Sequence, residues 1–157
     1  MIMAYDVYKV ANTLLTLADK AGEPLSNMKL QKLLYYEQGY FLGYFHRPLF
    51  QDKIEAWLYG PVVPCVYDKY KAYGNRQIEP READGLVEFQ KDDERELFEQ
   101  VYYVFSAYSA IGLMRMTHRE APWRDADCKR NEVIGRKRMQ DFFEERIKRD
   151  EKEQVCC

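Results

Sequence analysis

The 157-residue chain is poor in the residue types that build metal sites and simple catalytic centres. Its two histidines, His46 and His118, lie in separate contexts, and no H-E-x-x-H, G-x-S-x-G or glycine-rich phosphate loop occurs. The cysteines form no C-x-x-C pair, so neither a zinc site nor a disulfide framework is indicated; they are Cys65, Cys128, Cys156 and Cys157. We therefore expect no metal, no cofactor and no catalytic residues.

Long hydrophobic runs are also missing from the sequence. No window approaches 18 consecutive apolar residues, and the first residues show no basic segment followed by an apolar one. Lysine and arginine number 24 against 26 acidic residues, a net charge of -2, which argues against a general binder of nucleic acid or anionic membranes. These absences predict a cytoplasmic protein that has no membrane association.

The sequence is rich in tyrosine, with 13 residues, beside eight phenylalanines. A chain of this length normally forms one domain and buries roughly 70% of its unfolded surface, so it folds without metals or disulfides. Charges that nearly cancel and abundant aromatic residues argue against intrinsic disorder. The tyrosine excess is the compositional feature that needs a functional explanation.

Apolar residues recur at three- and four-residue steps along most of the chain. We predict an all-α, compact single domain of five to six helices over residues 1–147, with a short extended, hairpin-like piece near 49–60. Residues 148–157 form a charged C-terminal tail whose order the sequence leaves open. The predicted helices cover about 4–21, 26–45, 65–73, 92–108, 110–117 and 131–152.

The second predicted helix is apolar around most of its circumference, so it should lie at the centre of the fold. Ser26 or Asn27 is a good N-cap for it. Glu37 falls within the apolar arc, where it is either a functional acid or, as we favour, a structural glutamate paired with a tyrosine hydroxyl or a basic residue. Gly39 and Gly43 flatten one side of this helix, so another backbone can approach there.

His118 offers the best case for catalysis, because Glu120 follows closely and Glu37 is the other candidate carboxylate. A structural hydrogen bond at a helix end is the reading we favour for this histidine. The enzyme alternative, a small hydrolase-like protein, requires the imidazole and a carboxylate to converge within about 3 Å of a common point. The basic run at 129–138 is more typical of a solvated helix surface than of a nucleic-acid footprint.

Tyrosine and tryptophan cluster in three short segments around residues 35–36, 57–73 and 123. These residue types anchor protein interfaces, although internal packing between helices explains them equally well. Both roles stay open at this point.

Three motifs at these positions resemble those of the Panacea-domain antitoxins, the GepA-like or SocA-like phage-associated proteins. The first runs from Lys29 to Tyr36 and continues with Gln38-Gly39. The second, the most specific, runs from Ile54-Glu55-Ala56-Trp57 through Tyr59-Gly60-Pro61-Val62-Val63-Pro64 to Tyr67 and Tyr73-Gly74. The third combines Thr117-His118 with Pro122-Trp123, and the three together span most of residues 5–147.

The resemblance implies an all-helical antitoxin that neutralises a toxin by direct binding. The toxin is expected to come from the adjacent gene, often in a prophage or another mobile element. One branch of the family acts as an adaptor that delivers the toxin to the ClpXP protease. Homo-oligomers are an open alternative, and nucleic acid is not an expected partner. The motifs nominate these partner-binding candidates: Tyr35, Tyr36, Gln38, Trp57, Gly60, Pro61, Val62, Tyr67, His118 and Trp123.

Overall fold

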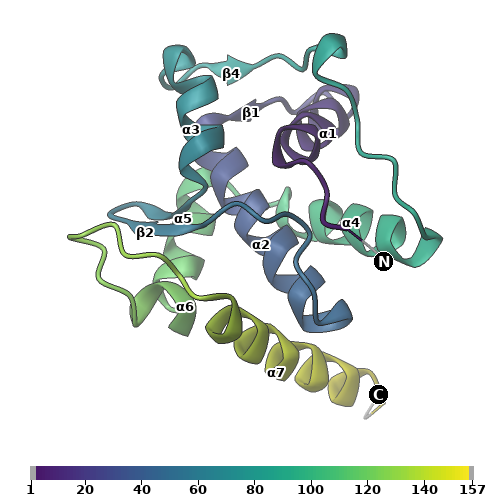
Figure 1. The fold of residues 1–157 in the computed structure, drawn as a ribbon, viewed down its shortest axis with the longest axis vertical. Helices are drawn as coiled ribbons and strands as arrows, with labels where there is room; N and C mark the ends of the chain where they lie inside the picture. Colours follow the sequence, from purple (N-terminus) through teal and green to yellow (C-terminus); the bar gives the residue numbers. More distant parts are fainter. Residues whose placement is uncertain (1–2, 156–157) are drawn as a thin grey trace.

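The computed structural model describes residues 3–155, and within that range the all-α class is confirmed by seven α-helices and two very small antiparallel sheets (Figure 1). No helix in this range is both long and apolar enough to cross a membrane. The α-helices are α1 (Val7–Lys20), α2 (Asn27–Phe45), α3 (Pro64–Tyr70), α4 (Asp92–Phe105), α5 (Ala110–His118), α6 (Ala121–Arg124) and α7 (Arg136–Val155). Two 3-10 turns, Lys71–Tyr73 and Glu82–Asp84, complete the helical part.

Helix α2 lies at the centre of the molecule, as its all-round apolar pattern predicts. Every residue from 30 to 39 is buried, because α1, α4, α5 and α7 pack around the helix (Figure 1). The hydroxyl of Ser26 caps the helix by accepting a hydrogen bond from the Lys29 backbone N–H at 3.3 Å. The polar groups of residues 30–39 are therefore available only to the interior of the fold or to pockets that reach it.

The extended piece predicted near residues 49–60 is an antiparallel hairpin of β2 (Glu55–Trp57) and β3 (Gly60–Val62). Glycine followed by proline is a turn signal, so Gly60-Pro61 is a candidate turn by sequence. The turn lies instead at 58–59, and Gly60 already belongs to β3. Gly60 has φ +117°, a conformation that L side chains rarely adopt. The other small sheet pairs β1 (Leu25–Ser26) with β4 (Gln77–Ile78).

Helix α7 begins at Arg136, five residues later than predicted, because the preceding loop is held by β2. The Ala56 N–H donates to the Glu132 carbonyl at 2.8 Å, and the Ile134 N–H donates to the Ile54 carbonyl at 2.8 Å. A residue paired with a strand cannot also supply helical hydrogen bonds. At its other end α7 continues to Val155 and so includes most of the segment assigned to a tail, while Cys156 and Cys157 lie outside the described residues.

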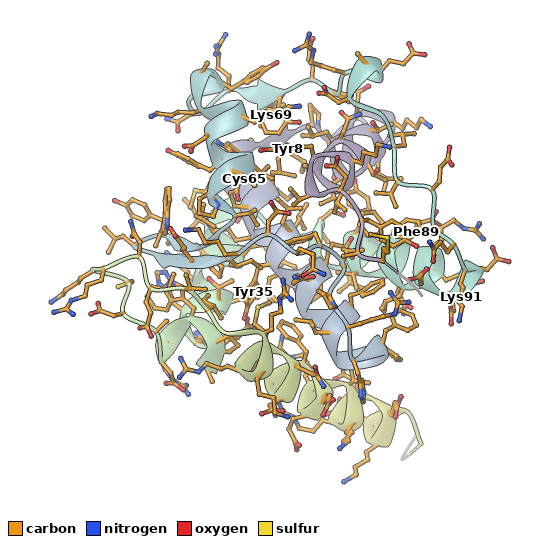
Figure 2. All side chains as sticks on the ribbon, in the orientation of Figure 1. Tyr8, Tyr35, Cys65, Lys69, Phe89 and Lys91 are labelled. Atoms are coloured by element: carbon orange, nitrogen blue, oxygen red, sulfur yellow. The ribbon has the colours of Figure 1, made fainter. Side chains whose placement is uncertain are left out.

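The flat side of α2 is covered by α7 and not by a partner. An added Cβ on Gly39 would lie 2.1 Å from the Phe143 ring, and one on Gly43 would lie 2.8 Å from Ile147. Phe143 also packs edge-on against Tyr35, which lies between α2 and α7 (Figure 2). The glycines therefore serve close packing between two helices within the domain.

Candidate functional site

A pocket of about 480 Å³ opens between the start of α2, the β2–β3 hairpin, α3 and the loop before α7. We call it the hairpin pocket. Its walls include three aromatic side chains, Trp57, Tyr59 and Tyr67. At its rim the hairpin turn presents Leu58 and Tyr59, which are 61% and 63% exposed. The other lining residues are Asn27, Met28, Gln31, Lys32, Val62, Lys71, Gly74, Asn75, Cys128 and Asn131.

Hydrogen bonds between side-chain amides and the backbone tie α2 to the hairpin and α3. The Gln31 side chain accepts from the Val63 N–H at 2.8 Å and donates to the Asn27 side chain at 2.9 Å. Asn27 in turn donates to the Tyr67 carbonyl at 3.2 Å. Because these groups are buried or partly buried, the relay fixes the first motif against the second.

The third motif supports the hairpin through an indole. Trp123, on the single turn α6, donates its Nε1–H to the Trp57 carbonyl at 2.8 Å. His118, at the end of α5, stacks on Trp123 with ring centroids 3.8 Å apart. Burial lowers the pKa of His118, a hydrogen bond with the Leu58 backbone opposes the shift, and the charge of Lys32 adds to it, so the neutral imidazole is favoured. The first two motifs thus line the hairpin pocket, and the third supports the hairpin from outside the pocket.

Lys32 is the most unusual residue of this site, because its side chain is only 2% exposed and yet carries an amine. Gly60 makes room for it, since a Cβ there would lie 2.8 Å from Lys32 Cε and 3.1 Å from Thr117 Oγ1. Burial lowers the pKa of Lys32 from 10.5 to about 8, and no other described group shifts it. The ammonium is therefore still roughly nine-tenths protonated at pH 7.

We expect Lys32 to make the protein more stable in mild alkali. Below pH 8 the amine is protonated in both the folded and the unfolded chain, so the folded state bears the full desolvation cost. Between pH 8 and 10.5 the unfolded chain binds more protons, and stability therefore rises with pH. Urea unfolding should show a gain of about 2 kcal/mol between pH 7 and 9.5. Lys32→Met should lack this gain, and an equal slope in both proteins would contradict the assignment.

Glu120 is buried, and three donors share its carboxylate. The hydroxyls of Tyr35 and Tyr36 donate to it at 3.0 and 2.9 Å, and Arg146 Nη1 of α7 donates at 2.9 Å. Burial raises the pKa of Glu120, although the Arg146 charge and the tyrosine hydroxyls oppose the shift. The two tyrosines are fully buried, so their place in the first motif reflects this internal network.

Glu37 is fully buried but has neither of the partners we expected. Its Oε2 has no hydrogen-bond partner among the described residues, and burial alone raises its pKa well above the usual range. Burial therefore favours the protonated, uncharged form of this carboxyl. The expected pairing of Glu37 was therefore wrong, and the glutamate that binds tyrosine hydroxyls and a basic residue is Glu120.

The geometry gives no support to the enzyme alternative. Neither Glu37 nor Glu120 is among the groups that perturb His118, whose Nε2 is buried without a hydrogen-bond partner. The Glu120 carboxylate is occupied by its tyrosine and arginine donors. Within residues 3–155 no three histidine, cysteine or acidic side chains are grouped to hold a metal ion.

The remaining nominated residues divide into buried and accessible ones. Gln38 is 2% exposed and holds the chain after α2, since its amide donates to the Phe50 carbonyl and accepts from the Leu49 N–H, both at 2.8 Å. The β3 residues Gly60, Pro61 and Val62 are also buried. The half-buried candidates that keep access to solvent are Trp57, Tyr67, His118 and Trp123.

Sequence reasoning missed Lys32, Leu58 and Tyr59 as site residues. A signal for Lys32 was present, because any charged residue on a helix that is apolar all round is buried, as was argued for Glu37. Leu58 and Tyr59 adjoin the nominated Trp57 and Gly60, but nothing in the sequence shows that they form the exposed turn of a hairpin.

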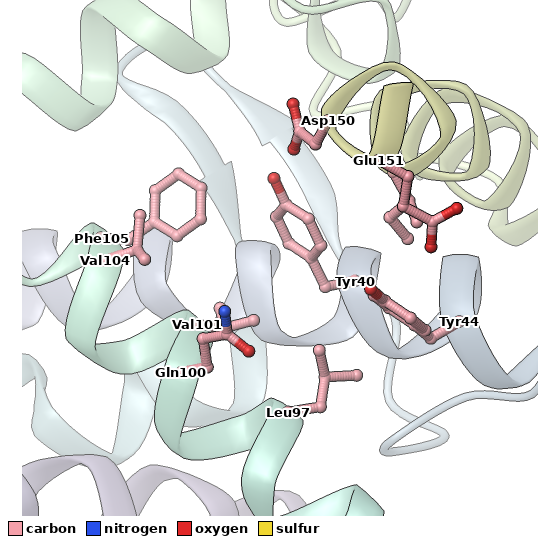
Figure 3. Close-up of a pocket in the computed structure, with 10 residues that line it drawn as sticks. Tyr40, Tyr44, Leu97, Gln100, Val101, Val104, Phe105, Asp150 and Glu151 are labelled. Atoms are coloured by element: carbon pink, nitrogen blue, oxygen red, sulfur yellow. The ribbon is translucent and has the colours of Figure 1, made fainter. Parts of the chain in front are cut away.

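A second hollow of about 180 Å³ lies between α2, α4 and the end of α7 (Figure 3). Tyr40, Tyr44 and Leu97 line it, and Asp150 and Glu151 add acidic groups. None of the motif residues nominated above lines this hollow.

The basic run at 129–138 is partly neutralised by neighbouring groups. Lys137 pairs with Asp141 at 2.9 Å, and Arg130 pairs with Asp127 at 3.6 Å. Arg136 donates to the backbone and side chain of Gln51 at 2.6 and 2.7 Å. These contacts are typical of a solvated, structurally engaged surface.

Comparison with protein families matches residues 30–124, more than half of the chain, to the family described as "Antitoxin SocA-like, Panacea domain". The chain belongs to this antitoxin family. The resemblance inferred from the three motifs is thus confirmed, and the matched region contains nearly all of them. A curated relative, "Antitoxin SocA" of Caulobacter vibrioides (strain NA1000 / CB15N), is 39% identical over 128 residues, covering 75% of this chain and 68% of the relative. No solved structure matches the chain.

Proposed function

We propose that this Panacea-domain protein is a non-catalytic antitoxin that binds a protein toxin through the hairpin pocket and its rim. The observation that carries the proposal is the meeting of all three family motifs at the hairpin whose inner side forms this pocket, through Gln31, Trp57 and Trp123. Family membership supports the antitoxin role. The exposed Leu58 and Tyr59 support the choice of surface, because exposed apolar and aromatic side chains around a pocket mark protein contact sites.

The direct test is co-expression with the product of the adjacent gene in the cytoplasm of a bacterial host, where we place the interaction. The neighbouring product alone should arrest growth, and the antitoxin should restore growth and form a complex that co-elutes in size-exclusion chromatography. A neighbouring product that is harmless alone, or that stays toxic when the antitoxin is present, would overturn the proposal.

The surface is tested by two matched double variants. Leu58→Ser with Tyr59→Ser alters the hairpin rim, and Tyr103→Ser with Val104→Ser alters exposed α4 residues that are 79% and 47% accessible. Loss of one interface anchor is worth about 2 kcal/mol, so the rim variant should bind the toxin about 30-fold more weakly. The α4 variant should bind like the wild type. The reverse result would move the interface to α4, and thermal melting checks that both variants fold.

Binding can neutralise the toxin in two ways: the antitoxin either occludes the toxin or also delivers it to the ClpXP protease. The two mechanisms differ in the fate of the toxin. Occlusion leaves toxin levels constant in hosts with and without the protease, whereas delivery lowers them only when the protease is present. A chase experiment that follows toxin abundance with the wild type and with the rim variant separates the two.

A further inference from the structure

The hairpin pocket contains a buried positive charge that no described residue neutralises. Other buried carboxylates in the fold have cationic partners: Glu94 pairs with Arg47 at 2.6 Å and Glu120 pairs with Arg146 at 2.9 Å. Burial raises the pKa of Glu37, which favours its uncharged form. Lys32 alone combines near-complete burial with a charge at pH 7 and no acidic partner among residues 3–153.

An unpaired buried ammonium costs free energy, and a fold keeps such a group mainly where it is used. The cost is lowest when an anion from outside supplies the missing partner. Lys32 lies within the pocket wall, so such an anion can reach it without unfolding the domain. Thr117 Oγ1 and the amine lie 3.1 and 3.4 Å from the same point, the position of a Cβ on Gly60, so a further polar group is near the amine.

The composition of the pocket favours an anion. Its lining contains two lysines, Lys32 and Lys71, and no aspartate or glutamate, although the chain as a whole carries a net charge of -2. Four amide side chains, Asn27, Gln31, Asn75 and Asn131, add polar groups. The volume of about 480 Å³ falls within the range of small-ligand sites and accommodates a side chain or a chain end.

The aromatic walls and the apolar rim favour a peptide over a small free anion. Trp57 and Tyr67 meet edge-on with centroids 4.9 Å apart, and Leu58 and Tyr59 extend the apolar surface beyond the pocket mouth. A small inorganic anion would leave these surfaces uncovered, whereas a polypeptide that inserts an acidic group buries them.

We propose that the hairpin pocket binds a carboxylate of an acidic segment of the partner protein, with the Lys32 ammonium as its counter-ion. This inference rests on the proposed function, because the partner is the toxin. The carboxylate belongs to an aspartate or glutamate side chain or to the C-terminus of the partner. Affinity comes from pairing the charge, and the aromatic walls hold the chain on either side of it.

The test compares Lys32→Met with Lys137→Met in calorimetric titrations against the product of the adjacent gene. Methionine keeps the length of the buried side chain and removes its charge, while Lys137 lies on the exposed face of α7. Lys32→Met should bind at least 30-fold more weakly, since truncating one member of a desolvated interfacial pair has large effects. Lys137→Met should bind like the wild type. Because Lys32→Met removes a buried charge, it should melt no lower than the wild type, so weak binding cannot be attributed to unfolding.

Peptides derived from the partner identify which of its carboxylates enters the pocket. Overlapping peptides of the gene product are compared with versions in which aspartate becomes asparagine, glutamate becomes glutamine or the C-terminus is amidated. One of these peptide changes should weaken binding to the wild type at least tenfold and binding to Lys32→Met less than twofold. If it is the amidation, the carboxylate is the C-terminus of the partner; if it is a replacement of aspartate or glutamate, the carboxylate is that side chain.

The failures are distinguishable. If the wild type binds the gene product and Lys32→Met binds equally well, the carboxylate site is refuted and the proposed function stands. If the wild type does not bind the gene product at all, both are refuted. If Lys32→Met binds weakly but no acidic change in the peptides matters, the carboxylate is refuted and Lys32 has another role at the interface.

Discussion

Replacing Glu120 by alanine is expected to destabilise the protein by about 3–5 kcal/mol. The substitution removes the shared acceptor of two tyrosine hydroxyls that are themselves fully buried. Each buried donor left without an acceptor costs about 1–3 kcal/mol. Arg146 loses its ion pair as well, and the vacated space adds a cavity.

Thermal melting measures this effect directly. For a chain of this size the loss corresponds to a fall in the melting temperature of roughly 10 °C or more. Glu145→Ala is the matched control, because this exposed glutamate also lies on the α7 side of the molecule but is solvated. Tyr36→Phe, which removes one donor and leaves the acceptor shared by the other two, should cost less than Glu120→Ala. Equal melting of Glu120→Ala and the wild type would show that the network contributes nothing.

The second large effect is expected for Gly39→Ala. A Cβ there would lie 2.1 Å from Phe143 Cε2 and 2.5 Å from two more ring atoms, far inside van der Waals contact. Alanine is the better helix former by about 1 kcal/mol, so propensity alone predicts stabilisation. The cost of overpacking outweighs this gain in helix propensity. The added methyl forces α7 away from α2, although large side chains pack these two helices closely together. We expect a net loss of about 2 kcal/mol.

Gly135→Ala is the control for this prediction, since nothing lies within 4 Å of a Cβ at that position. It should be neutral or slightly stabilising. Combining Gly39→Ala with Phe143→Leu tests the mechanism, because a smaller side chain opposite the new methyl should recover part of the loss beyond simple additivity. Denaturant unfolding of the wild type, Gly39→Ala, Phe143→Leu and the double variant gives the interaction free energy between the two positions. A Gly39→Ala protein as stable as the wild type would contradict close packing at this point.

Helix positions could be predicted where local signals decide them. Ser26 and Ser109 cap α2 and α5, and Gly74 ends the 3-10 turn after α3 with φ +57°. The start of α7 could not be found in this way. Its preceding loop is extended because β2 supplies the hydrogen bonds of Glu132 and Ile134, and that pairing joins segments far apart in the chain.

The site was predictable in its residues but not in their orientation. The motifs located Trp57 and Tyr67, which line the hairpin pocket, and Trp123, which supports the hairpin through its bond to the Trp57 carbonyl. Tyr35 and Tyr36 belong to the same motifs and face inward, since their partner Glu120 lies 85 and 84 positions further along the chain. Whether an aromatic residue on a fully enclosed helix faces a neighbour or a partner depends on such distant pairing, and periodicity carries no information about it.

The indole of Trp123 gives the molecule a built-in optical sensor. The chain has two tryptophans, and they are linked to each other by the bond from the Trp123 indole to the Trp57 carbonyl. All indole emission therefore comes from the surroundings of the hairpin, and the imidazole stacked on Trp123 is placed to modulate it. Arrival of a partner at this surface should change intrinsic fluorescence without any attached dye, while events on the α4 side leave the spectrum unaltered.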